Sequence, residues 1–143
     1  MNAVQPTKRE VAEQFAAGKH CAQCSLCPWA EELGYDAEEL EHLACAFGGG
    51  MFRGDTCGAV TGSLMALGLA CGDAQDRVKA KTAAFQAAFT ERFGSTICRE
   101  LIGFDVSKPG EFEKAAESGI MMELCPELVC GAVEIMNRLL EDE

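Results

Sequence analysis

The chain has 143 residues, a formal net charge of −11 and nine cysteines. This length predicts a single domain over residues 1–143, because a domain of about 150 residues buries roughly 68–70% of its unfolded surface. The acidic charge argues against nucleic acid or an anionic membrane as a partner, and it suits solubility or docking on a basic protein.

The N-terminal segment, MNAVQPTKREVAEQF, carries charges where a signal peptide needs an apolar run. The uncharged segment 57–71 is shorter than the ~20 residues that a membrane-spanning helix needs. We therefore expect no membrane insertion and a cytoplasmic location, where thiols normally stay reduced. Nine is an odd number of cysteines, so disulfides alone cannot use every sulfur. Free thiols, metal ligation or a redox pair are favoured over a disulfide framework.

Three helices are expected before residue 50, because apolar residues recur there at helical spacing. The first ends at Gly18, and the second covers about residues 19–33 with a disturbance at Pro28. The third follows a cap at Asp36, and its expected inner face comprises Leu40, Leu43, Ala44 and Phe47.

The segment Cys57–Cys71, CGAVTGSLMALGLAC, contains no charged residue. A helix that is apolar on all sides belongs in the interior, so this segment is the expected central helix. A glycine-rich loop, residues 47–54, precedes it and is expected to shape the approach to Cys57.

The second half of the chain predicts four further helices. A long one starts at Asp73, and a short one runs from the cap Ser95 to Gly103. A loose helix is expected around residues 112–117, and the last begins at Cys125-Pro126. No segment alternates like a β-strand. The prediction is an all-α fold, a compact single-domain helical bundle with a central apolar helix.

Four cysteines fall at the expected starts of four different helices. Capping residues precede two of them, and proline, which favours the first helical position, follows a third. The four are Cys21, Cys57, Cys98 and Cys125.

A helix N-terminus carries partial positive charge and unpaired N–H groups, which lower a thiol's pKa and stabilise the thiolate. If these four helix starts converge, four thiolates form a site that suits zinc or an iron–sulfur cluster.

The other five cysteines have different interpretations. Cys45, Cys71 and Cys130 are expected to be small buried apolar residues. Cys24 and Cys27 extend Cys21 into Cys-x-x-Cys-x-x-Cys, which resembles part of the bacterial ferredoxin run but lacks its fourth local cysteine. A thioredoxin-style Cys21–Cys24 pair lacks the βαβ context that such a pair has.

Two further polar residues accompany the cysteines. His20 precedes Cys21, either as an auxiliary ligand or, the favoured interpretation, as a solvated residue at a helix start. Arg99 follows Cys98 and is expected to have a structural or solvated role. The carboxylates are scattered, and no hydrolase triad is indicated.

The motif Phe47-Gly48-Gly49-Gly50-Met51, followed by Cys57-Gly58-Ala59-Val60-Thr61-Gly62, resembles a family of redox-active proteins named for its C-GCAxxG-C-C cysteine pattern. The segments Cys21-Ala22-Gln23, Gly94–Gly103 and Cys125–Val129 resemble its other cysteine elements. The resemblance implies an all-helical redox domain whose functional set is Cys21, Cys57, Cys98 and Cys125. Cys24 and Cys27 depart from the family pattern.

Three functions remain open at this point. The first is an electron-transfer or redox-sensing protein with a four-cysteine site that ligates an iron–sulfur cluster or another metal, and that serves a redox partner protein. The second is a thiol–disulfide module that forms a reversible bond among the same cysteines. The third is a structural bundle that binds zinc or another metal. No motif for catalytic turnover is present.

Overall fold

The computed structural model describes all 143 residues, and these form helices joined by short loops, with no β-strand. The prediction of an all-α fold is confirmed. In chain order the helices are α1 (Lys8–Ala16), α2 (Cys21–Leu26), η1 (Cys27–Trp29), α3 (Ala30–Leu33), α4 (Ala37–Ala44), η2 (Gly50–Gly54), α5 (Gly58–Cys71), α6 (Gln75–Phe93), α7 (Cys98–Ile102), α8 (Glu111–Ser118) and α9 (Ile120–Leu139).

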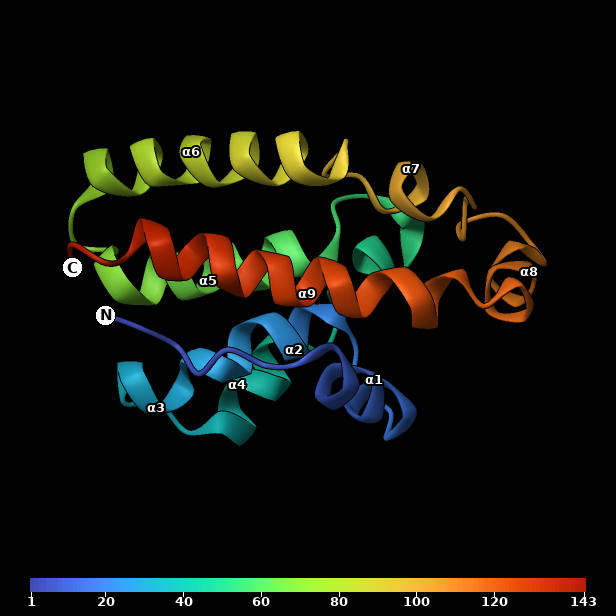
Figure 1. Ribbon diagram of the computed structural model, residues 1–143, viewed down its shortest axis with the longest axis horizontal. Helices are drawn as coiled ribbons and strands as arrows, with labels where there is room; N and C mark the ends of the chain where they lie inside the picture. The colour runs from blue at the N-terminus through green and yellow to red at the C-terminus, as the bar shows by residue number, and fades with distance from the viewer.

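The long helices α5, α6 and α9 pack together along the length of the molecule (Figure 1). Helices α1 to α4 cover one side of them, and α7 and α8 lie at one end. Both chain termini lie at the opposite end, where the amino group of Met1 donates to the Glu143 carbonyl at 3.4 Å. No helix is both long enough and apolar enough to cross a membrane.

Helix α5 is the central helix, as its uncharged sequence predicts. It packs against α2, α6 and α9, and it buries Val60, Ala66 and Leu67 completely. A Cβ at Gly62 would overlap the Ala22 carbonyl and the Ser25 hydroxyl. This glycine therefore sets the close approach of α5 and α2, which carries Cys21.

Aromatic and aliphatic side chains fill the main core. Along α6, the Phe89 ring lies 6.0 Å from that of Phe85 and 4.8 Å from that of Phe93, centroid to centroid. One stripe of α9 is fully buried, and it consists of Val129, Val133 and Met136, continued by Leu140 at the C-cap. A second small cluster forms around Cys98, Ile102 and Ala115. Several of the cysteines lie at the boundary between these two clusters.

Several helix boundaries differ from those expected. Helix α9 begins at Ile120 rather than at Cys125, because Gly119 in the left-handed conformation separates it from α8. Pro126 therefore lies inside the helix, where its missing N–H leaves the Met122 carbonyl without an i+4 donor. Helix α7 begins at Cys98 itself. The expectation that Leu43 faces inward is wrong, since 54% of this residue is exposed.

Candidate functional site

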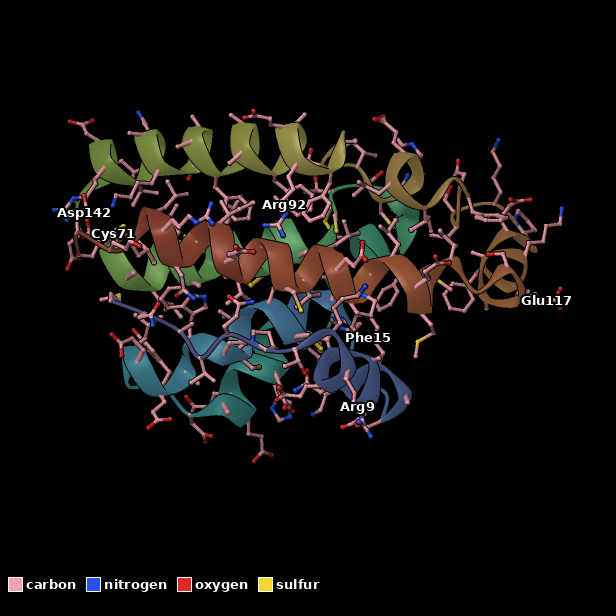
Figure 2. All side chains as sticks on the ribbon, viewed as in Figure 1. Arg9, Phe15, Cys71, Arg92, Glu117 and Asp142 are labelled. Carbon is pink, nitrogen blue, oxygen red and sulfur yellow. The ribbon has the colours of Figure 1, made fainter.

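A cavity of about 770 Å³ lies near the end of the bundle formed by α7 and α8. Fourteen of its eighteen lining residues are hydrophobic. Phe15, labelled in Figure 2 between α1 and α9, forms part of the wall. The structure brings all four predicted site residues to this cavity: Cys21, Cys57, Cys98 and Cys125. Their role as ligands remains a prediction.

Cys21 is the first residue of α2, and His20 is the N-cap. The sulfur accepts hydrogen bonds from the backbone N–H groups of Gly49 and Gly58. Gly58 is the first residue of α5, and a Cβ there would overlap the Cys21 sulfur. The contact thus needs glycine on α5, and it joins the starts of α2 and α5 at one sulfur.

Cys57 and Cys98 are brought together by a single antiparallel β-bridge between Thr56 and Ile97. The Cys57 N–H donates to the Thr96 carbonyl at 2.8 Å, and the Cys98 N–H donates to the Asp55 carbonyl at 2.6 Å. Each cysteine therefore directly follows a bridged residue and enters its own helix from there.

Arg99 stabilises the contact between the segments that carry Cys57 and Cys98, in agreement with the structural role expected for it. Its guanidinium donates to the Gly54 carbonyl at 3.2 Å and to the Asp55 carboxylate at 2.9 Å. These bonds hold α7 against η2 and keep Cys98 beside the cavity.

The glycine-rich loop forms one side of the cavity. Met51 and Phe52 both adopt left-handed backbone conformations, with φ of 59° and 57°. Such conformations cost energy in residues other than glycine and persist only where the surroundings enforce them. Phe52 lines the cavity and meets the His20 ring edge-on at 6.1 Å between centroids.

His20 is more enclosed than a solvated residue, so that interpretation of the sequence is wrong. Its Nε2 lies 2.9 Å from the Cys45 carbonyl, and its Nδ1 is buried without a partner. A Cβ at Gly48 would lie 2.6 Å from the ring, so this glycine leaves the room that the imidazole occupies.

Cys125 corrects the argument that all four cysteines occupy helix starts. Cys21 and Cys98 are the first residues of their helices, and Cys57 is an N-cap. Cys125 lies inside α9, because that helix starts five residues earlier, at Ile120. It reaches the cavity from the side of α9, so the field of a helix N-terminus does not act on it.

Within the cavity, Cys21 is the residue that ionises most readily. Its pKa falls to about 6, chiefly because the Cys57 thiol donates a hydrogen bond to it, with help from the Gly49 N–H, His20 and the Gly58 N–H. The same hydrogen bond, together with burial, raises the pKa of Cys57 well above its ordinary value. The helix-start argument favours a thiolate at Cys57, whereas the surroundings of this hydrogen-bonded pair favour it at Cys21, which receives the stronger set of donors.

The two remaining thiols stay protonated at neutral pH. Burial, and after it the nearby Cys21 thiolate, raises the pKa of Cys98 to about 11 and that of Cys125 to about 12. Without a bound cation, the four thiols therefore hold a single negative charge.

The other five cysteines lie outside this cavity. Figure 2 shows Cys71 beside Asp142, at the end of the bundle that holds the termini and away from Phe15. Cys71 is buried, as expected, Cys130 is half-buried, and Cys45 is exposed, contrary to expectation. Cys24 and Cys27 line a separate hollow.

Sequence reasoning missed the apolar wall opposite the thiols. Phe112, Met121 and Met122 line it, and Phe112 and Met122 are more than half exposed, at 54% and 51%. The segment that carries them has weak helical periodicity, so only the Met-Met pair just before Cys125 signals them.

One family of known proteins matches the part of the chain that contains the four cavity cysteines. A family model described as "Putative redox-active protein (C_GCAxxG_C_C)" matches residues 19–139, which include all four cavity cysteines. No curated protein and no solved structure gives a significant match. The chain belongs to the C_GCAxxG_C_C family of redox-active proteins.

Proposed function

We propose that this protein transfers electrons or senses redox state through an iron–sulfur cluster held by Cys21, Cys57, Cys98 and Cys125. One observation carries the proposal: four cysteines from well-separated segments line one largely apolar cavity, while the other five lie elsewhere. A core that needed only small apolar residues would have no reason to collect thiols around a cavity.

The arrangement of the thiols favours a cluster over a single metal ion. A tetrahedral zinc ion with Zn–S bonds of about 2.3 Å would hold its sulfurs about 3.8 Å apart. No three His, Cys, Asp or Glu side chains in this chain lie close enough together to hold one ion. The ligands of a cluster bind different iron atoms, so their sulfurs lie further apart. A cavity of about 770 Å³ has room for such a group.

The charges in the cavity also favour an iron–sulfur cluster. Burial, and after it the charge of Cys21, raises the pKa values of Cys98 and Cys125, so four thiolates in this apolar cavity are unfavourable without a bound cation. A polycationic iron core would reverse this effect, since thiols that bind metals are deprotonated. The N–H groups of Gly49 and Gly58 would continue to donate to the Cys21 sulfur, and such bonds tune cluster potentials.

When bound, the cluster would supply one-electron transfer. Phe52, Phe112 and Met122 are exposed and line the same cavity, so an acceptor protein docked over them would come close to the cysteines. The net charge of −11 favours a redox partner with a basic docking surface. The proposal suits a reducing compartment such as the cytoplasm.

The Cys21–Cys57 contact supports a second candidate function, reversible thiol–disulfide exchange. The Cys21 thiolate would attack a partner's disulfide, forming a mixed disulfide and releasing one partner thiolate. Cys57 would then attack the Cys21 sulfur, releasing the second partner thiolate and leaving a Cys21–Cys57 disulfide. Two electrons pass from the pair to the partner, and the Cys57 proton leaves as its thiolate forms. A thiol with a pKa of about 6 is ionised at neutral pH, as this chemistry needs.

Metal analysis under strictly anaerobic conditions separates the two candidates. The cluster proposal predicts iron and acid-labile sulfide in the purified protein, a visible absorption band, and their loss in both Cys98→Ser and Cys125→Ser. The exchange candidate predicts no iron, and a Cys21–Cys57 disulfide that forms equally well in both variants. An anaerobic, iron-supplied protein without sulfide would contradict the cluster proposal.

A further inference from the structure

A second pair of cysteines, Cys24 on α2 and Cys27 at the start of η1, does not line the cavity. Cys24 and Cys27 line a surface hollow of about 240 Å³, a volume equal to roughly eight waters at ~30 Å³ each. Lys19 and Glu41, which also line the hollow, form an ion pair there. None of the four cavity cysteines reaches this hollow, so it is a separate thiol site.

The backbone spacing of these two cysteines suits a disulfide. Residues three apart on an α-helix have Cα atoms about 5 Å apart, inside the 4.4–6.8 Å range of disulfides. Cys24 lies in the last turn of α2, and Cys27 is the first residue of η1, directly after that turn.

Pro28 gives this turn freedom to adjust. The Cys24 carbonyl would bond to the N–H of residue 28 in a continuous helix, but proline has none. Cys24 is therefore not clamped to the next turn, and closing a Cys24–Cys27 bond breaks no backbone hydrogen bond between these positions.

We infer that Cys24 and Cys27 form a second redox pair, which is oxidised to an intramolecular disulfide by small neutral disulfides that enter this hollow. Cys27 attacks first, because it is partly exposed while only 4% of Cys24 is accessible. The Cys27 thiolate, its proton lost to solvent, bonds to one sulfur of the small disulfide and releases one thiolate. Cys24 then loses its proton and attacks the Cys27 sulfur, releasing the second thiolate. The two cysteines give two electrons, and the small disulfide becomes two thiols.

The charges in the hollow determine the chemistry of the co-reactant. Glu10 and Glu41 face a single cation, Lys19, so the hollow has a net negative charge that disfavours anionic disulfides. Burial raises the pKa of Cys24 to about 12 and that of Cys27 to about 11, and Lys19 opposes both shifts. The order of these pKa values agrees with Cys27 as the attacking residue.

Differential labelling of the full-length protein tests this inference. The anaerobically purified protein is treated with bis(2-hydroxyethyl) disulfide, and free thiols are blocked with iodoacetamide. Disulfides are then reduced and the released thiols labelled with N-ethylmaleimide. Trypsin releases residues 20–53 as one peptide, and fragmentation assigns the late label to individual cysteines. The expected result is late label at Cys24 and Cys27 together, with an unreduced sample showing a bond within the peptide.

Two variants distinguish the first attack, by Cys27, from the second attack, by Cys24. Cys24→Ser removes the second attack, so Cys27 should retain one mercaptoethanol adduct. Cys27→Ser removes the first attack, so Cys24 should lose its late label. Cys45→Ser serves as a control, because Cys45 is exposed and lies on the same peptide, and the Cys24–Cys27 bond should form in it unchanged.

A Cys21–Cys24 bond, or a Cys24 adduct that survives in wild type, would overturn the inference. Iron and sulfide content is measured on the same samples. The redox state of Cys24 and Cys27 is therefore determined independently of whether the protein binds the proposed cluster.

Discussion

Gly58, at the start of α5, lies so close to Cys21, at the start of α2, that a side chain on it would overlap the sulfur. The Cβ would also lie 2.8 Å from the Ala22 nitrogen and 3.1 Å from the Phe47 carbonyl. Three different segments therefore meet at this glycine. Its own N–H donates to the Cys21 sulfur, so the same residue provides both the space and part of the charge stabilisation.

Gly58→Ala should push the Cys21 sulfur out of its set of donors and raise its pKa from about 6 toward the ordinary value near 8.5. The pH dependence of Cys21 alkylation, followed by mass spectrometry on reduced protein, would report the shift. Gly68→Ala is the matched control, since it lies in the same helix with nothing within 4 Å of its Cβ. That substitution should leave Cys21 unchanged and stabilise the fold by about 0.5–1 kcal/mol. An unchanged Cys21 profile in Gly58→Ala would contradict the role of this contact.

The lowered pKa of Cys21 predicts how the stability of the reduced, metal-free protein depends on pH. Between about pH 6 and 8.5 the unfolded chain holds a proton that the folded chain has lost, so stability should rise with pH. The contribution is complete above about pH 8.5 and disappears as pH falls through about 6. Above that range the raised pKa of Cys57 reverses the slope.

Anaerobic urea unfolding at several pH values would measure this rise. Cys21→Ala also removes an interaction that raises the pKa values of Cys57, Cys98 and Cys125. Below about pH 8.5 unperturbed thiols are protonated, so in that interval the difference between variant and wild type reports the ionisation of Cys21. Parallel curves for the two proteins across this interval would show that Cys21 ionises alike in both states.

Cys57→Ser should remove iron and sulfide to a far greater extent than Cys71→Ser. The two cysteines bound the same apolar helix, and both are buried, but only Cys57 lines the cavity. Cys71 instead donates to the Leu67 carbonyl at 3.4 Å at the other end of the helix. Metal and sulfide analysis of the two variants after identical anaerobic purification provides the comparison. Equal losses would indicate general destabilisation rather than ligation.

Arg99→Ala should loosen the contact between η2 and α7, and so expose Cys98 to alkylating reagents. Its bonds to Gly54 and Asp55 are partly solvated, so the expected loss of stability is only about 1 kcal/mol. The measurement is the alkylation rate of Cys98, which is 8% exposed in the folded protein. Arg138→Ala, which removes an exposed pair with Glu134, should leave that rate unchanged.

The sequence was most informative where local chemistry determines structure. The uncharged segment after Cys57 predicted the central helix, and Pro28 predicted the break between α2 and α3. Glycine marked most helix ends, as at Gly103, which caps α7 in the left-handed conformation. These features depend on a few neighbouring residues, so they can be read without knowledge of the fold.

Predictions from the sequence were less successful where contacts between distant segments compete with signals from neighbouring residues. Cys125-Pro126 looked like a helix start, but packing carries α9 through Pro126 from Ile120. The preference for a thiolate at Cys21 comes chiefly from the hydrogen bond that Cys57 donates, with help from the Gly49 N–H, and sequence alone positions neither group. The prediction of four convergent cysteines came from helix starts and family pattern. The β-bridge that joins two of them leaves no sequence signal.

The pairing of Thr56 with Ile97 also bears on biosynthesis. The two residues are 41 positions apart, and the nineteen residues of α6 must fold back before they can meet. Cys125 emerges later still, on α9. A ribosome-bound chain therefore exposes Cys21, Cys57 and Cys98 before the complete pocket can protect them from oxidants or stray metal ions. Any prosthetic group would have to be delivered to the finished polypeptide, and a nonsense mutation before α9 would yield a product that cannot be matured.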